Sequence, residues 1–170
     1  MVGDLTLVEQ FLNTLDERSF RKHGKQHVPA DHLTSVDELA SWLADHGFPG
    51  HGGEAGLAAA RALRAALRET LGGGGGEALG DFPLRLAPDP DGRLRVAADS
   101  GVPGLDAIVE AVAVSVAGGG FHRLKLCAAE DCRWAFHDTS RNGGGRWCGM
   151  ETCGNRAKTR AYRRRPATPA

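Results

Sequence analysis

The residues best suited to bind a metal lie in the last third of the chain. All four cysteines of the 170 residues are there, as Cys127 and Cys132 followed by Cys148 and Cys153. Four residues separate the members of each pair and fifteen separate the pairs, giving the pattern C-x4-C-x15-C-x4-C. Four thiolates can fill the tetrahedral coordination shell of Zn²⁺, and two close pairs joined by a loop supply them. The spacing therefore predicts a structural zinc site that uses all four cysteines.

Other uses of these cysteines fit the spacing less well. There is no C-x-x-C pair of the redox type, and the spacing differs from that of ferredoxin iron–sulfur runs. His122 or His137 could replace one cysteine as a ligand, because both lie close in sequence. A catalytic zinc keeps an open coordination position, which four cysteines would fill, so no enzyme is expected. A second metal site is a weaker option, since no helical pair with a carboxylate occurs among His23, His27, His32, His46 and His51.

A basic segment follows the last cysteine and reads C-G-N-R-A-K-T-R-A-Y-R-R-R. A helix here would begin at a metal ligand and stop before Pro166, with most of its arginines along one face. Such a helix can neutralise phosphates, and arginine can also recognise guanine edges. Asn155 could recognise adenine or simply cap the helix. The sequence therefore predicts nucleic-acid contacts from Asn155, Arg156, Lys158, Arg160, Arg163 and Arg164.

Charge is divided unevenly along the chain, although 21 basic and 21 acidic residues balance overall. Residues 121–170 carry 11 Lys/Arg against 4 Asp/Glu, and the preceding 120 residues carry 10 against 17. This division predicts an acidic body joined to a basic module. The basic residues could bind nucleic acid, remain solvated, or pair with acidic groups of the body.

The sequence also suggests a cellular compartment. Residues 1–20 lack the basic start and apolar centre of a signal peptide, and no stretch approaches the roughly 18 apolar residues of a membrane span. We therefore expect a soluble, cytoplasmic protein with no membrane partner. In that compartment close cysteine pairs are more often metal ligands than disulfides.

The elements that would carry these residues follow from apolar spacing. Helices are expected over 4–16, 35–46, 54–71 and 103–117, the second opening with a capping box from Ser35 to Glu38. Alternating segments around a Pro-Asp-Pro-Asp-Gly turn predict a β-hairpin over 82–97. The predicted fold class is α+β: a mainly helical body with a small β-hairpin, plus a C-terminal treble-clef-like or zinc-ribbon-like module.

Three glycines at 118–120 suggest the domain boundary, with a body over 1–119 and a zinc module with its basic helix over 120–166. A module this small buries little apolar surface, so the metal should supply much of its folding free energy. Within the body, residues 17–32 are expected to form an exposed loop. The helix over 54–71 carries an arginine row that we expect to be a solvated face, with anion binding as the alternative: Arg61, Arg64 and Arg68.

Two motifs resemble known families. The run W-C-x4-C-G-N-R over 147–156, preceded by the first cysteine pair, closely resembles the CGNR zinc finger. The F-L-N-T-L run over 11–15 and the D-x-L…L-x-x-W-L run over 31–43 resemble the ABATE domain of stress-induced transcription regulators. The resemblance implies zinc binding and a role in transcription, and it defines no effector.

These observations together predict a zinc-binding, DNA-binding transcriptional regulator acting in a stress response. Its body would sense a small-molecule effector, pair two subunits into a homodimer, or contact other proteins. The alternative is an RNA- or protein-binding adaptor whose zinc site is purely structural.

Overall fold

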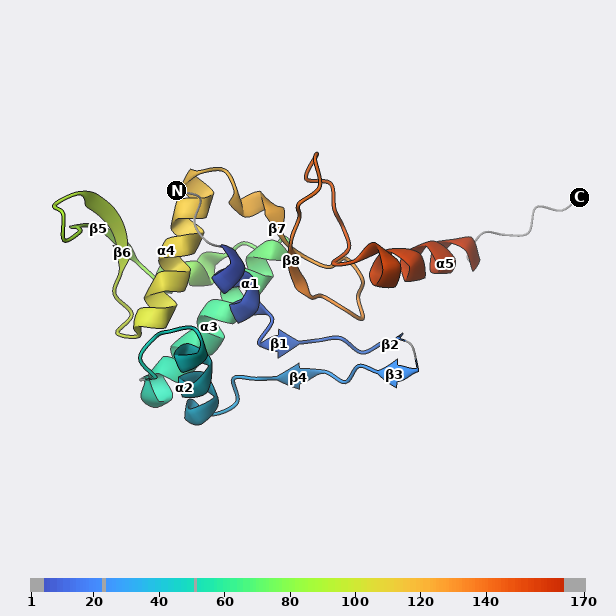
Figure 1. Cartoon of the computed structure of the whole chain (residues 1–170), viewed down its shortest axis with the longest axis horizontal. Coiled ribbons are helices and arrows are strands. Elements are labelled where there is room, and N and C mark those ends of the chain that lie inside the picture. Colours follow the sequence, from blue (N-terminus) through green and yellow to red (C-terminus); the bar gives the residue numbers. More distant parts are fainter. Residues whose placement is uncertain (1–4, 23, 51, 164–170) are drawn as a thin grey trace, which may run out of the picture.

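The computed structural model describes residues 5–22, 24–50 and 52–163. Within them the fold is α+β, with five α-helices and four separate two-stranded antiparallel ladders (Figure 1). The helices are α1 (Leu5–Leu12), α2 (Val36–Asp45), α3 (Gly53–Leu71), α4 (Pro103–Ala117) and α5 (Asn155–Arg163). The ladders pair β1 (Leu15–Asp16) with β4 (Ala30–Asp31), β2 (Arg21–Lys22) with β3 (Lys25–Gln26), β5 (Leu84–Pro88) with β6 (Leu94–Ala98), and β7 (Leu124–Leu126) with β8 (Ala135–His137).

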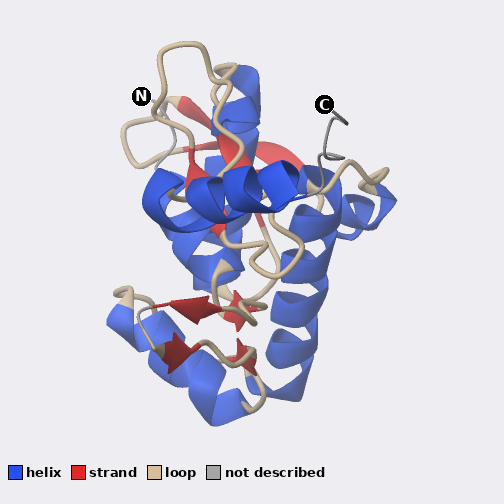
Figure 2. Ribbon diagram, turned by 90° about the vertical axis from the view of Figure 1, so that its right-hand side faces the viewer, coloured by secondary structure: helices blue, strands red, loops and turns tan. Residues whose placement is uncertain are grey.

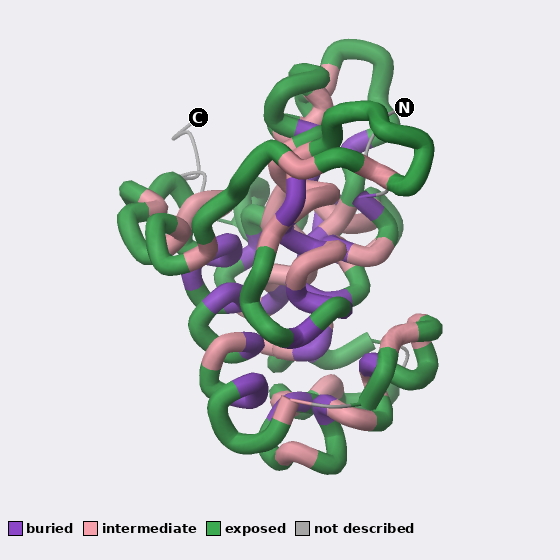
Figure 3. Tube along the Cα trace, turned by 90° about the vertical axis from the view of Figure 1, so that its left-hand side faces the viewer, coloured by how far each residue is buried: buried purple, intermediate pink, exposed green. Residues whose placement is uncertain are grey.

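The main core lies where α1, α3 and α4 pack against one another, with α2 covering one end. Apolar residues at helical spacing put side chains such as Phe11, Leu63 and Ile108 fully inside. In Figure 3 the buried positions gather at the centre, while the connecting loops around them are exposed. The expected helices and the hairpin β5–β6 are confirmed. Near the end of α4, Val116 is 57% exposed.

The local signals at α2 act as the sequence indicates. The Glu38 backbone N–H donates to Ser35 Oγ at 3.2 Å, and the Ser35 N–H donates to Glu38 Oε2 at 3.1 Å. This reciprocal pair is a capping box, which satisfies two of the free N–H groups at the helix start. Gly47 follows the helix with φ of 79°, a conformation that glycine adopts without strain.

Residues 15–31 form an arm rather than the loop expected there, and the arm ends in the ladder β2–β3 (Figure 1). Two arginines of α3 hold its base. Arg64 donates to both carboxylate oxygens of Asp31 at 2.7 Å, and Arg68 forms an ion pair with Glu17. Both arginines are 5% exposed, so the expectation of a solvated arginine face is wrong for them. Their long apolar stems cross the core surface while their guanidinium groups find fixed acidic partners.

Helix α1 ends at Leu12, four residues earlier than the pattern suggested, because the next two side chains bond elsewhere. Asn13 exchanges two hydrogen bonds with the backbone of Ala135 in β8, at 2.9 and 2.8 Å. The Thr14 hydroxyl donates to Phe11 O at 2.7 Å and accepts from Arg64 at 2.9 Å. The F-L-N-T run thus joins the body to both the arm and the C-terminal region.

The hairpin β7–β8 belongs to the main core as well as to the cysteine region. Leu124 and Ala135 are buried in the cluster formed by the helices, although both follow the predicted boundary at 119/120. We use "cysteine module" for residues 120–163, and the domain division itself stays a prediction. Within the described part of the chain, no helix has the length and apolar character needed to cross a bilayer.

Candidate metal centre

The four cysteines converge on one point. Their Sγ atoms all lie within 4.8 Å of one another, with 3.6 Å between Cys132 and Cys148 and 3.7 Å between Cys148 and Cys153. A tetrahedral Zn²⁺ with bonds of about 2.3 Å would hold its sulfur ligands about 3.8 Å apart. The donor set and these two distances therefore fit zinc. Among the described residues this is the one group of His, Cys, Asp or Glu side chains placed to hold a metal ion, and neither His122 nor His137 belongs to it.

A tight turn between β7 and β8 presents the first cysteine pair. The Cys127 N–H donates to Trp134 O at 2.9 Å, and the Cys132 N–H donates to Ala129 O at 2.9 Å. Arg133 closes the turn with φ of 48°, an unusual conformation for a residue other than glycine. The turn thus folds the backbone back so that the thiols of Cys127 and Cys132 lie together in the cysteine cluster.

The loop between the two pairs is organised by Asp138, which is 3% exposed. Its carboxylate accepts from Lys125 Nζ at 2.7 Å and from the N–H groups of Ser140 and Gly145 at 3.0 and 2.7 Å. Hydrogen bonds from Lys125 and Ser140 hold the pKa of Asp138 well below its ordinary value. A Cβ on Gly145 would lie 2.6 Å from Asp138 Oδ1, so only glycine fits there. These hydrogen bonds fold the loop back toward the first cysteine pair, so that Cys148 and Cys153 reach the cluster.

The second pair leads directly into α5. A short π-turn, η3 (Met150–Gly154), contains Cys153 and continues into the helix. A Cβ on Gly154 would lie 2.7 Å from the Met150 sulfur and 3.4 Å from Trp147, so a larger residue here would displace the Met150 side chain. Cys153, one of the four clustered cysteines, therefore lies immediately before the start of α5.

The thiols interact strongly with one another. Hydrogen bonds from Cys132 and Cys148, aided by backbone N–H groups, lower the pKa of Cys127 to about 2. The hydrogen bond to Cys127 raises the pKa of Cys132 to about 12. Hydrogen bonds with Cys127 and Cys132 raise the pKa of Cys148. A bound dication would supply the positive charge needed for all four to ionise.

Arg156 braces the site from α5. Its guanidinium donates to both carboxylate oxygens of Asp131, at 2.8 and 3.0 Å, and to Cys153 Sγ at 3.5 Å. The same group lies 3.7 Å above the ring of Phe20, which comes from the arm. Burial alone would raise the pKa of Asp131, but hydrogen bonds and charge from Arg160 and Arg156 hold it below its ordinary value. Arg156 therefore links Cys153, the first cysteine turn and the arm.

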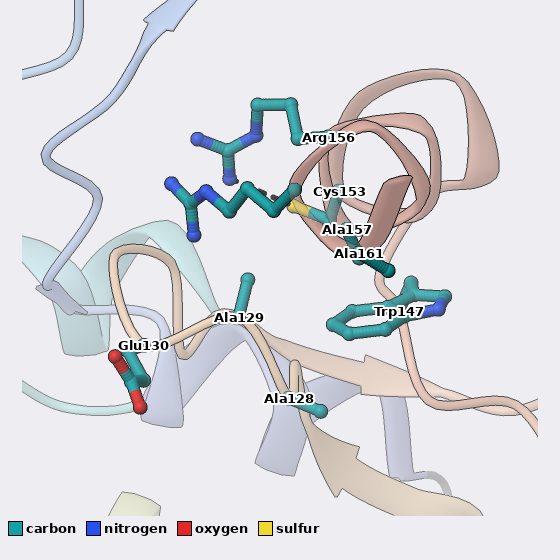
Figure 4. Close-up of a pocket in the computed structure, with 9 residues that line it drawn as sticks. Ala128, Ala129, Glu130, Trp147, Cys153, Arg156, Ala157 and Ala161 are labelled. Atoms are coloured by element: carbon teal, nitrogen blue, oxygen red, sulfur yellow. Dashed lines mark hydrogen bonds between the residues drawn. The ribbon is translucent and has the colours of Figure 1, made fainter. Parts of the chain in front are cut away.

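Helix α5 has an inner and an outer face. A pocket of about 220 Å³ separates it from the first cysteine turn, and Arg156, Ala157 and Ala161 line this inner side (Figure 4). Arg160 also lines the pocket and donates to Asp131 at 2.7 Å, although its side chain is 52% exposed. The outer face is formed by exposed residues: Asn155, Lys158, Thr159, Tyr162 and Arg163.

The structure therefore does not bring all the predicted nucleic-acid contacts onto one face. Lys158 and Arg163 point outward, and neither forms an ion pair with another described residue. Asn155 is exposed, with its amide 3.5 Å from Glu151 O, and it does not cap the helix. Arg156 and Arg160 are paired with Asp131 inside the module rather than with the acidic body. Arg164 lies outside the described residues.

Sequence reasoning missed the arm's part in the site. Phe20 is 7% exposed and packs in one cluster with Cys127, Ala129, Cys132 and Cys153. The Ser19 N–H donates to Asp131 O at 3.0 Å. The one signal for this was a single large apolar residue at position 20 within an otherwise polar stretch. Three aromatic residues also pack against the cluster, all partly buried: Trp134, Phe136 and Trp147.

Comparison with protein families agrees with this geometry. Residues 123–166 match the family model described as "CGNR zinc finger", which spans all four cysteines. Residues 5–129 match the ABATE family model, described as "Putative stress-induced transcription regulator". A comparison with curated proteins gives no match. Because the second of these family models covers more than half of the chain, the protein belongs to the ABATE family, and its C-terminal region matches the metal-binding CGNR zinc finger.

Proposed function

We propose that the protein is a DNA-binding transcriptional regulator in which a zinc ion, held by the four cysteines, fixes helix α5 for contact with duplex DNA. Zn²⁺ would act structurally here, because four cysteine ligands leave no coordination position for a substrate. Neither matched family is an enzyme family, and we propose no catalytic role.

The observation that carries this proposal is the outer face of α5. The helix starts at a metal ligand, and its outward cations Lys158 and Arg163 have no acidic partner among the described residues. A rigid helix whose outer charges are not neutralised is suited to bind phosphates. Arg160, half exposed, would share its charge between Asp131 and DNA, and Arg156 would position the helix. Asn155, at the start of the outer face, could reach a base edge, and Arg164, outside the described residues, stays a predicted contact from the sequence alone.

The test is binding of a fluorescently labelled duplex by the zinc-loaded chain, measured by anisotropy across salt concentrations. We expect binding that weakens steeply with salt, and a loss of affinity in Lys158→Gln/Arg163→Gln that is similar for different sequences, as for phosphate contacts. Absence of duplex binding at low salt would overturn the proposal. Preference for RNA, or for an acidic protein, would instead support an adaptor with a structural zinc site.

In this proposal the body is the regulatory part. An apolar pocket of about 170 Å³ lies between α3, α4 and β5, lined by residues such as Leu67, Phe82 and Val109. It has the character of a site for a small apolar effector. A homodimer through the body and a cytoplasmic, stress-responsive role are further parts of the proposal. A shift in melting temperature on adding an effector, and light scattering for the dimer, would test them.

A further inference from the structure

The arm separates its charges between base and tip. Its three acidic residues lie near the base and are all paired: Asp16 with Arg18, Glu17 with Arg68, and Asp31 with Arg64. The tip carries the arm's other cations, Arg21, Lys22 and Lys25, all exposed. Within the described part of the chain, none of these three forms an ion pair. The tip therefore concentrates positive charge that no acidic side chain of the described residues neutralises.

The strand pairing at the tip increases this charge density. In the ladder β2–β3, Lys22 lies directly opposite Lys25, and Gly24 turns the chain between them with φ of 79°. Like charges placed opposite each other across a ladder destabilise it. A local arrangement that is unfavourable for folding, at an exposed position, is typical of a site that binds an oppositely charged partner.

The tip is also held at the same end of the molecule as α5. In Figure 1 the ladder β2–β3 and α5 lie at one end, and in Figure 2, viewed from that end, the arm's strands lie below α5. Contacts fix this arrangement: Phe20, next to the tip, packs against the metal-site cysteines and under the guanidinium of Arg156. The tip and α5 are thus positioned by the same cysteine cluster, and a groove lined by Lys22 and Glu151 lies between the arm and η3, the turn that leads into α5.

We infer that the tip of the arm is a second DNA-binding element, which contacts phosphates beside those bound by α5. This inference rests on the proposed binding of duplex DNA by α5. Two cationic elements held at a fixed separation suit a polyanion with regularly spaced charges, and a DNA backbone provides this. Because Phe20 docks on the cysteine cluster, the metal site would set the distance between the two elements.

The test compares charge-matched variants of the zinc-loaded full chain in the anisotropy assay. Lys22→Gln/Lys25→Gln removes two charges from the tip, and Arg85→Gln/Arg93→Gln removes two from the hairpin at the opposite end (Figure 1). We expect the tip variant to reduce the slope of log affinity against log salt by about 2, because each phosphate contact contributes about 0.9. The control variant should leave the slope close to that of the unmodified chain. Equal slopes in the two variants would overturn the inference.

Two further outcomes show how this inference relates to the proposed function. If Lys158→Gln/Arg163→Gln weakens binding and the tip variant does not, DNA binding by α5 stands and the role of the tip is wrong. If the unmodified chain binds no duplex at low salt, both fail together. Hydroxyl-radical footprinting gives a second readout, since loss of the tip should shorten the protected region on one side only. A footprint of unchanged length would contradict a phosphate contact by the tip.

Discussion

The body and the cysteine module are stabilised by different means. The main core contains 17 buried apolar residues, contributed chiefly by α1, α2, α3 and α4. The cluster in the cysteine module contains five, among the described residues, and three of these are cysteines: Cys127, Cys132 and Cys153. Apolar burial alone can stabilise the first, whereas the second buries too little apolar area for that, and we expect it to depend on a cation bound by its sulfur atoms. The proposed zinc site thus predicts one region that folds by packing and one that folds on binding metal.

The arm connects these two regions and is held by each in its own way. At its base, buried guanidinium groups of Arg64 and Arg68 bind its carboxylates. Near its tip, Phe20 packs on the cysteine cluster. Loss of the metal should therefore release the tip while the base stays attached.

The largest expected effect comes from removing the metal or one of its ligands. Zinc binding contributes about 10–16 kcal/mol to small zinc-dependent folds, so Cys153→Ser or a strong chelator should unfold residues 139–163. Helices α3 and α4 should keep their structure, because their core contains no cysteine. Hydrogen exchange followed by mass spectrometry would show protection lost in α5 and at the arm tip and retained over 57–68. Unchanged protection in α5 after chelation would mean that packing, and not the metal, stabilises the module.

A substitution in the main core should affect the body and leave the cysteine module unchanged. Leu105 is 0% exposed and lies in the main core, so Leu105→Ala should reduce the free energy of unfolding by about 2–5 kcal/mol. Denaturant titration followed by far-UV circular dichroism would measure it. The zinc affinity of the folded protein should not change, since Leu105 touches no cysteine cluster residue. A matching loss of zinc affinity would show that the two regions are one cooperative unit.

The sequence predicted the elements whose signals are local. The capping box at Ser35 and the apolar spacing of α3 and α4 each depend on neighbouring residues, and both are confirmed. Cysteine spacing likewise predicted which thiols come together. These patterns work because the interactions involved lie within one or two turns, or within one tight loop.

The arm could not be predicted because its interactions are distant in sequence. Its ladders have two residues per strand, too few for an alternating pattern. Arg64 and Arg68 have the spacing of a solvated helix face, and only the position of Asp31 and Glu17 in space makes them buried partners. The orientation of α5 was uncertain for the same reason, since Asp131, which turns two arginines inward, lies 25 residues from Arg156.

A smaller effect is expected where α5 supports the metal site. Arg156→Lys keeps the charge and loses the two-pronged contact with Asp131 and the planar contact with Phe20. Groups that support metal ligands typically affect affinity about 10–100-fold, so zinc affinity should fall within that range. Competition with a coloured chelator would measure it. Lys158→Gln, on the outer face, serves as the control and should leave zinc affinity unchanged; equal affinities for all three proteins would rule out this role for Arg156.

The smallest effect concerns the joint between the two regions. Asn13 in the body exchanges two hydrogen bonds with Ala135 in β8, and Ala135 is 0% exposed. Asn13→Ala should destabilise the protein by about 1–2 kcal/mol, because each lost bond contributes about 1 kcal/mol. The change should also separate the unfolding of the two regions, since it weakens a direct bond between them. Far-UV circular dichroism would follow the body, and zinc release to an indicator dye would follow the module.

Ser35→Ala provides the matched control for this separation. It removes the helix cap of α2, within the body, and should destabilise by about 1 kcal/mol. Because the cap contacts only body residues, zinc release and helix loss should still occur at the same denaturant concentration. If Asn13→Ala shifts both transitions together, as Ser35→Ala does, the coupling must be carried by other contacts. Arg68 would then be the next residue to test, because it bonds to Leu12 O in the body and to Arg133 O in the cysteine turn.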